Sequence, residues 1–469
     1  MQDAMNNNSI LTSVKHSALR ALIGVFLFLV AHNFYNIELI REKSTDVSFD
    51  LINELWFSNI ETSTNTQAIV FSVDNYYLRQ NKLLDEHNNT TYGYLFPRSY
   101  IAKFIKSVDK RSVNQETPIA LFIDYDMRYT SVPDNQSLSD DDLKLLEALA
   151  GTDESNRPYP ILLATTASNT FIERFANGDY GDQHDVLASK LKTLIQNKQI
   201  IFVSVKMLQS KDGIYRMHRP YLALDGNRDH DLYSFGTVGW QLASNGKIDR
   251  NEIDENFDSE IFTDNKKMSS GYSIISSNIL FKNITTSTRK ENNVTYTTKN
   301  SNWLDCRSFS AHVIDLNIST IKNRIVLFGS DHANSDDIFQ VSTDYSLQDD
   351  SSIPVLSGIQ MHANTLMTML YLDGSIKPLS PYLSALLIFI IFITVDLFVQ
   401  YRLKKLSSFA RFSISLVCIF IPFIALSGLL LIYAKIWFNW AFPLLFFYVE
   451  EIFDIIKRLV SFKQRKKED

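Results

Sequence analysis

The stretch SPYLSALLIFIIFITVDLFVQY, residues 380–401, is long and apolar enough to cross a bilayer as a single helix. Working outward from it, further apolar runs occur at residues 18–37, 412–433 and 436–456. Residues 41–379, which separate the first run from the others, have the mixed composition that is typical of a folded domain. The layout therefore predicts a four-span α-helical membrane region that carries one large domain outside the bilayer.

Basic residues beside the apolar runs set the predicted orientation. Lys15 and Arg20 accompany the first run, and Lys and Arg crowd residues 402–411 and 457–469. Under the positive-inside rule these segments are cytoplasmic, so both tails, 1–17 and 457–469, are expected inside and residues 41–379 outside. No small-residue cleavage site follows the first run, so we interpret it as a retained anchor rather than a signal peptide.

Charge and cysteine content narrow the function classes. The chain has 46 basic and 52 acidic residues, and residues 41–379 hold 33 and 44 of them, which gives the predicted outer domain a net charge of −11. Such a distribution argues against nucleic-acid binding, which depends on clustered Lys and Arg. Cys306 lies in the predicted outer domain and Cys418 in a span, so neither a disulfide framework nor a zinc motif is expected.

The outer domain alternates runs typical of buried strands with runs typical of helices. The predicted strands are residues 67–74, 118–126, 160–167, 200–207 and 324–330. The predicted helices are residues 97–108, 139–149, 185–196 and 358–372. Near-continuous apolar strands indicate a sheet covered on both faces, so we predict an α/β domain with a mostly parallel buried sheet. Residues 248–303 are rich in Asn, Ser, Thr and Lys and indicate an insertion or a peripheral hairpin.

Polar side chains gather where the predicted strands end. Ligands of open α/β sheets favour the carboxyl edge, where helix N-termini also lie. Asp331 and His332 directly follow the last predicted strand and belong to the same region. The candidate ligand-binding residues are Asp74, Arg98, Asp124, Asp126, Asp336, Asp337 and His362.

Structural roles compete with ligand binding at each of these positions. An Asp at a strand end is more often a turn or helix cap than a ligand contact. His362 fits a buried histidine, and Arg98 fits an ion pair with one of the aspartates. A metal site or a catalytic role is a weaker alternative, because the sequence lacks a phosphate loop, a nucleophile elbow and an HExxH motif. We therefore expect neither enzymatic activity nor a metal or cofactor.

Seven segments together resemble the CHASE domain of type 2, a bacterial extracellular sensor domain. They are FDLINELW (49–56), VFSVDNYYL (70–78), YGYLFPRSYIAKFI (92–105), ALFIDYDMRY (120–129), DGIYRMHRPY (212–221), NRIVLFGSDHANSDDIF (323–339) and SGIQMHANTLMTML (357–370). Members of that family typically place the domain after one transmembrane helix and before three. The resemblance thus implies a multi-pass protein of the bacterial inner membrane, with residues 41–379 in the periplasm or outside the cell.

Two departures from the family pattern shape the expected function. The chain stops at Asp469 without the kinase or cyclase that usually follows, and residues 92–98 lack the tryptophans of the family's turn. The resemblance implies a sensor of an unknown small molecule or envelope state that signals to a separate protein in trans. The alternative is a structural subunit of an envelope or surface assembly that senses nothing. The sequence leaves open whether the chain forms a homo-oligomer.

Overall fold

The structure is a computed structural model of the whole chain. It describes residues 15, 18–19, 21–27, 29, 46, 48–57, 67–85, 89–92, 95–113, 116–132, 137–151, 157–166, 169–181, 184–209, 215–218, 221–222, 232–249, 251–253, 277–278, 284–291, 294–301, 305–308, 321–331, 338–340, 355–374, 376–403, 406, 408–438, 440–441 and 444.

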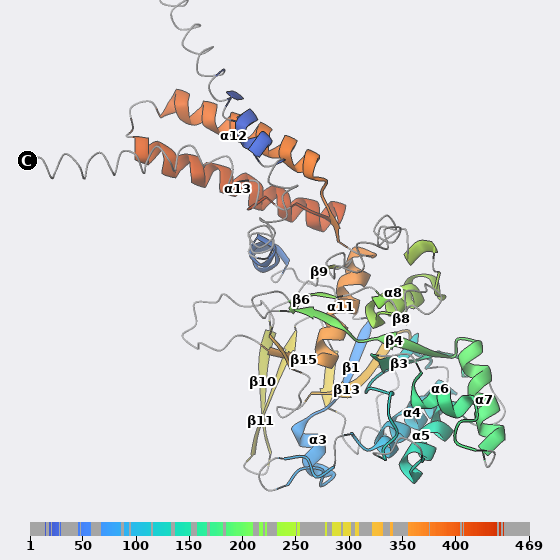
Figure 1. The fold of residues 1–469 in the computed structure, drawn as a ribbon. Helices are drawn as coiled ribbons and strands as arrows, with labels where there is room; N and C mark the ends of the chain where they lie inside the picture. The colour runs from blue at the N-terminus through green and yellow to red at the C-terminus, as the bar shows by residue number, and fades with distance from the viewer. Residues whose placement is uncertain are drawn as a thin grey trace, which may run out of the picture. The chain divides into compact units, whose positions relative to one another are not determined.

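The chain divides into two compact units. Residues 59–375 form the α/β unit, and residues 1–58 together with 376–469 form the apolar helical unit. Figure 1 shows the elements of both units, each of which is described by itself below.

A six-stranded parallel sheet is the centre of the α/β unit. Its strand order is β12-β1-β13-β2-β3-β4, and every neighbouring pair runs parallel. The strands are β12 (Asp305–Ser308), β1 (Ala68–Val73), β13 (Ile325–Ser330), β2 (Ala120–Asp124), β3 (Ile161–Thr165) and β4 (Ile200–Ser204). The structure confirms the α/β class, and all five strands predicted from apolar runs belong to this sheet.

The order of the strands differs from their order in the chain. Strand β13 lies between β1 and β2, pairing Val70 with Leu327 and Leu327 with Phe122. Because parallel strands place their carboxyl ends at one edge, the chain segments that leave β1, β13 and β2 are neighbours there. The edge strand β12 was not predicted, since its sequence DCRS lacks an apolar run.

Helices of the first half of the domain cover one face of the sheet. They are α4 (Arg98–Ser112), α5 (Asp140–Ala150), α6 (Phe171–Ala176) and α7 (Asp185–Gln196). A capping box explains the start of α5, because the Ser139 hydroxyl accepts from the Asp142 amide while the Asp142 carboxylate accepts from the Ser139 amide. Apolar side chains of these helices join the odd-numbered residues of β1, including Phe71, in one core.

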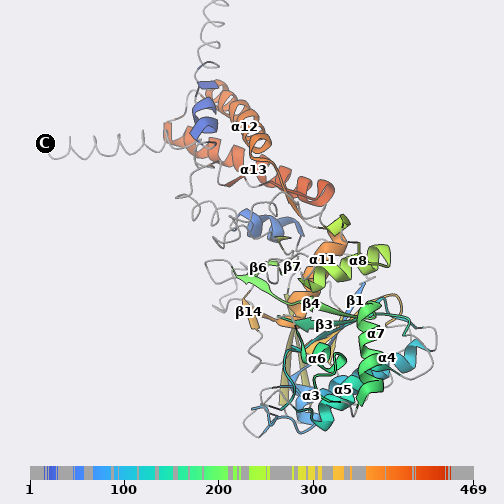
Figure 2. The same ribbon diagram turned by 45° about the vertical axis from the view of Figure 1, so that its right-hand side comes forward.

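The opposite face is covered by α8 (Phe235–Asn245) and α11 (Gly358–Leu372), as Figures 1 and 2 show. Phe235 of α8 stacks on Phe122 of β2, with 3.9 Å between the ring centroids. Helix α11 ends at its C-cap Asp373, which adopts a left-handed conformation. This face forms the second core, built on the alternate residues of the same strands, such as Val70 and Leu327.

Shorter elements surround this three-layer arrangement. They are α3 (Asn75–Gln80), β5 (Met207–Gln209), β6 (Tyr215–His218), β7 (Tyr221–Leu222), β8 (Leu232–Tyr233), β9 (Ser277–Asn278), β10 (Ile284–Glu291), β11 (Val294–Ser301), β14 (Ile338–Gln340) and β15 (Val355–Ser357). Strands β10 and β11 form an antiparallel hairpin, which agrees with the hairpin expected within residues 248–303.

The apolar helical unit contains α12 (Pro381–Arg402) and α13 (Ser408–Ala434). Each is long and apolar enough to cross a membrane, over Tyr382–Val399 and Ser413–Ala434. The described residues therefore give two candidate membrane spans rather than the predicted four. Half of the predicted span at 18–37 and most of the predicted span at 436–456 lie outside the described residues. Residues Ile436–Trp437, where the last span was predicted to begin, form the short strand β17.

Close contacts join the segment before residue 58 to α13 within this unit. The π-helical turn η2 (Asn53–Phe57) places the Trp56 indole against Gly428, where an added Cβ would come within 2.5 Å of the ring. Phe49 packs edge-on against Trp437, with 5.1 Å between the ring centroids. Strand β16 (Lys377–Pro378), which directly precedes α12, pairs in parallel with β17. The entry to one candidate span is thus bonded to the exit of the other.

Candidate functional site

Three carboxyl groups lie at the carboxyl edge of the three central strands. Asp74 follows β1, Asp331 follows β13, and Asp124 is the last residue of β2. The register places Asp124 directly beside Gly329 of β13, and the Asp331 amide donates to the carbonyl of Val73 at 3.0 Å. The fold therefore brings the three aspartates to one edge of the sheet, as the sequence predicted for Asp74 and Asp124.

The first turn of α11 meets this edge at close range. Gly329 makes the approach possible, because an added Cβ would lie 2.9 Å from the Asp124 Cβ and 3.0 Å from side-chain atoms of Ile359. Those distances are shorter than ordinary carbon contacts. The absence of a side chain at Gly329 therefore lets the Asp124 side chain and the start of α11 approach the backbone of β13 closely.

Gln360 of α11 binds Asp331. Its Nε2 donates to Oδ2 of Asp331 at 3.0 Å, and Gln360 is almost fully buried. Burial raises the pKa of the Asp331 carboxyl, and the charge of Asp74 raises it further. The hydrogen bond from Gln360 acts in the opposite direction by stabilising the carboxylate, yet the net shift of the Asp331 pKa is upward.

His362 lies beside Asp124 on the same helix. Its Nε2 is 3.7 Å from Oδ1 of Asp124, and both side chains are only 6% exposed. The imidazole also meets the rings of Phe122 and Phe235 nearly at right angles. Two residues that the sequence proposed for one site, Asp124 and His362, are thus in direct proximity, and the imidazole is buried as the structural alternative expected.

Asp74 has a clear structural role in addition to its position. Its Oδ1 accepts from the Tyr77 amide at 2.8 Å, so Asp74 is the N-cap of α3. The helix-cap alternative is confirmed for this residue. Its charge still acts on Asp331 across the sheet edge, as the raised pKa of Asp331 shows. We call Asp74, Asp124, Asp331, Gln360 and His362 the strand-end cluster.

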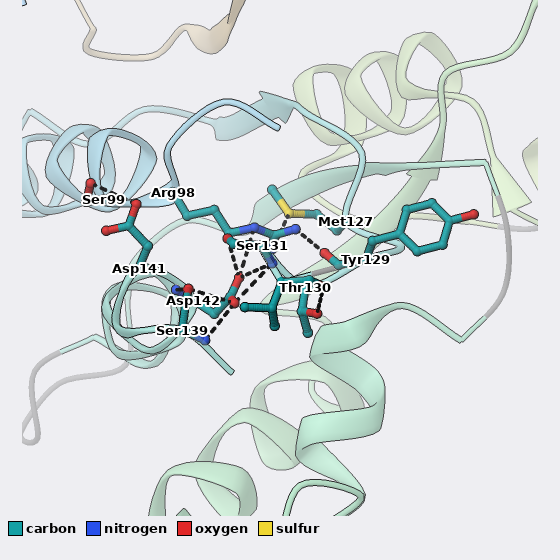
Figure 3. Close-up of polar contacts among 10 residues, drawn as sticks. Arg98, Ser99, Met127, Tyr129, Thr130, Ser131, Ser139, Asp141 and Asp142 are labelled. Atoms are coloured by element: carbon teal, nitrogen blue, oxygen red, sulfur yellow. Dashed lines mark hydrogen bonds and ion pairs between the residues drawn. The ribbon is translucent and has the colours of Figure 1, made fainter. Parts of the chain in front are cut away.

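Arg98 belongs to a different group of residues, which Figure 3 shows. Its Nε lies 3.1 Å from Oδ1 of Asp142, and the two side chains are 3% and 0% exposed. The guanidinium also donates to the Tyr129 carbonyl and lies over the Phe171 ring, 4.0 Å from the ring centroid. Desolvation lowers the pKa of Arg98 to about 10, although nearby carboxylates act to raise it.

Asp142, the ion-pair partner of Arg98, is itself fixed in place by several hydrogen bonds. Besides Arg98, its carboxylate accepts from the amides of Ser131 and Ser139 and from both of their hydroxyls. One carboxylate therefore fastens the start of α4, the loop after β2 and the N-terminus of α5. This arrangement confirms the expectation that Arg98 pairs with an aspartate, but the partner was not among the predicted residues.

Asp126 pairs locally. Its Oδ2 lies 2.5 Å from Nε of Arg128, and its Oδ1 accepts from the Arg128 amide at 3.0 Å. The charge of Asp126 acts to raise the pKa of Arg98. Asp126 is therefore grouped with Arg98 and not with the strand-end cluster. Asp336 and Asp337, the remaining predicted site residues, lie outside the described residues, as does His332.

Sequence reasoning missed Gln360 and Gly329 as parts of the site. The available signal was the segment SGIQMH, which opens a helix directly after a strand and carries polar residues in its first turns. Within the described part of the chain, no group of three or more His, Cys, Asp or Glu side chains is arranged to hold a metal ion. The strand-end cluster is thus a largely buried set of acidic and polar groups in close contact.

Comparisons with known proteins agree with the resemblance seen in the sequence. Residues 22–397 match the protein family described as the CHASE2 domain. No curated protein matches the chain. No solved structure matches it either.

Proposed function

The chain belongs to the CHASE2 domain family, a family of sensor domains, and from that premise we propose that it is a membrane-anchored sensor. Its α/β unit perceives a small molecule or an envelope state outside the cytoplasm. Its helices then relay the signal to a separate partner protein, by a population shift between two arrangements of the same chain.

The observation that carries the proposal is the position of α11. Its first turns supply Gln360 and His362 to the strand-end cluster, and the chain continues from its last residue, through β16, into the candidate span α12. A change at the cluster thus acts on the element that is joined most directly to the membrane segment. Pairing of β16 with β17 extends that connection to the end of α13.

The proposed location follows from the same elements. We place the protein in the bacterial inner membrane as a multi-pass chain, with both termini in the cytoplasm and residues 41–379 in the periplasm or outside the cell. The candidate spans α12 and α13 and the basic segments beside them support this placement. In this proposal the chain catalyses no reaction itself, and its output depends on a signalling or assembly protein in trans.

Ligand-dependent stability tests the sensor function. The full chain in mild detergent is melted in the presence of size-fractionated extract of the extracytoplasmic space. A fraction that holds the stimulus is expected to raise the melting temperature, because binding to the folded state alone stabilises it, by about 2.7 kcal/mol at a hundredfold excess over Kd. The D373N variant, altered at the other end of α11, is expected to respond like the natural chain.

A structural subunit of an envelope assembly would behave differently. It would show no stabilisation by any fraction, and it would co-purify from its native membrane in fixed stoichiometry with envelope proteins. That pair of results would contradict the sensor proposal and support the alternative.

A further inference from the structure

We propose that the strand-end cluster senses protons, so that acidification outside the cytoplasm is a stimulus that the chain detects. The inference rests on the proposed sensor function and names its stimulus. It starts from the titratable groups at the ends of β1, β13 and β2, which lie close to a titratable group in the first turns of α11.

Four titratable groups of the described residues meet at this edge. Asp74 directly follows β1, Asp331 directly follows β13, Asp124 is the last residue of β2, and α11 supplies His362. Helix α8, which also packs against this region, contributes the uncharged ring of Phe235. Three acids and one base are therefore brought together at one buried edge of the sheet.

Burial makes the charge state of this set sensitive to pH. The side chains of Asp124 and His362 are 6% exposed, so water screens their charges poorly. Desolvation of the half-buried Asp331, together with repulsion from the buried Asp74, raises the pKa of Asp331. Histidine is the side chain whose ordinary pKa lies between pH 5 and 8.

Acidification is expected to add protons at two contacts of α11. A proton on Asp331 removes its repulsion with Asp74 and leaves its hydrogen bond from Gln360 in place. A proton on His362 creates an opposite charge 3.7 Å from Asp124. The first change relieves repulsion between the ends of β1 and β13, against which α11 packs, and the second strengthens the contact of α11 with Asp124. The start of α11 should therefore be held more firmly at acid pH.

Hydrogen–deuterium exchange on the full chain in lipid nanodiscs tests the inference. Exchange is compared at pH 7.5 and pH 5.5, with labelling times scaled for the intrinsic effect of pH on amide exchange. Amides of α11 are expected to gain several-fold protection at the lower pH, because protons that bind the folded state more tightly stabilise it. An unchanged protection of α11 in the natural chain would overturn the proposal, and this measurement needs no variant.

Two substitutions locate the effect in the cluster. D331N resembles the protonated acid and can still accept from Gln360, so its protection at pH 7.5 should rise toward the acid level and its pH response should be smaller than that of the natural chain. H362Q removes a titrating group and should reduce the pH response. D373N is the matched control, because it changes a carboxylate on the same helix while keeping an acceptor for the Trp240 indole. Loss of the pH response in D373N, or its full retention in both cluster variants, would contradict the inference.

The same experiment separates the stimulus from the relay. Protection that changes in α11 and also in residues 376–380 and 435–438 supports both proton sensing and transmission to the helical unit. A response confined to α11 supports the proton sensor and counts against the relay. Extract-dependent stabilisation without any response to pH supports the sensor function and overturns the proton stimulus.

Discussion

The sequence proposes Arg98 as a ligand-binding residue, but the contacts of its side chain are those of a residue that stabilises the fold. It lies at the start of α4, near the edge where a ligand would bind, yet it is buried in an ion pair with Asp142 and stacks on Phe171. Asp142 at the same time closes the capping box of α5. A charge this well partnered has little capacity left for a ligand, so we assign Arg98 to the stability of the fold.

Removal of this guanidinium should therefore be costly. R98M leaves Asp142 buried with part of its partners gone, and breaking a buried pair of this kind costs about 3–5 kcal/mol. We expect a clear drop in the melting temperature of the full chain in detergent. The control is R128M, which breaks the exposed Arg128–Asp126 pair, with side chains 37% and 28% exposed, and should cost less than about 1 kcal/mol. Equal losses in the two variants would contradict this assignment.

The raised pKa of Asp331 predicts how the stability of the folded chain depends on pH. Its pKa in the folded chain is raised, so the folded state binds a proton more tightly than the unfolded state does. The stability that this group contributes is therefore fully present below its ordinary pKa of 3.8 and is lost as pH rises through the raised value. Relative to the natural chain, D331N should gain melting temperature as pH rises from 4 to 8. A difference between the two chains that stays constant over this range would refute the assignment.

Some contacts of the candidate site could be predicted from the sequence and others could not, for physical reasons. Asp124 and His362 could be proposed together because a strand end and the helix that follows another strand meet at one edge of a parallel sheet. The partner of Arg98 could not be predicted, since several aspartates lie nearby in the chain and only the packing of α4 on α5 selects Asp142. Gln360 was missed because a helical pattern does not reveal which polar residue of a first turn faces the sheet.

At the scale of elements, α8 is the clearest omission from the sequence-based prediction. Its sequence FGTVGWQLASN holds two glycines, which disfavour a helix when propensity alone is considered. The structure explains both, because Gly236 lies against Thr365 of α11 and Gly239 lies against Leu366. Packing between the two helices thus outweighs propensity. The strands, by contrast, were predictable because burial on both faces requires continuous apolar runs.

The packing of α8 against α11 can be tested by one substitution that introduces a steric clash and a second that removes it. In G236A the new Cβ would lie 2.6 Å from Cγ2 of Thr365 and 3.2 Å from Sδ of Met369, so the helices must move apart. Overpacking of this kind costs about 1–3 kcal/mol. T365S removes the clashing methyl group and keeps the hydroxyl that donates to the Met361 carbonyl. We expect G236A/T365S to melt higher than G236A, and no recovery would contradict the packing described.

For the whole molecule, the decisive question is how the chain crosses the membrane. Helices α12 and α13 are two candidate spans, and the sequence predicts two more at residues 18–37 and 436–456. With four spans, both termini lie on the same side as the basic loop between α12 and α13. With three spans the termini lie on opposite sides, so the position of each terminus tests the number of spans.

Cysteine labelling distinguishes these topologies in a chain that carries C306A and C418A. V186C is placed in α7, where Val186 is 86% exposed, while S13C and S461C report the two tails. We expect a membrane-impermeant maleimide to label V186C in spheroplasts, and to label S13C and S461C only after the membrane is permeabilised. Labelling of one tail in intact spheroplasts would mean an odd number of spans. Labelling of both tails with protection of V186C would reverse the orientation, and a sensor directed outward would then be wrong.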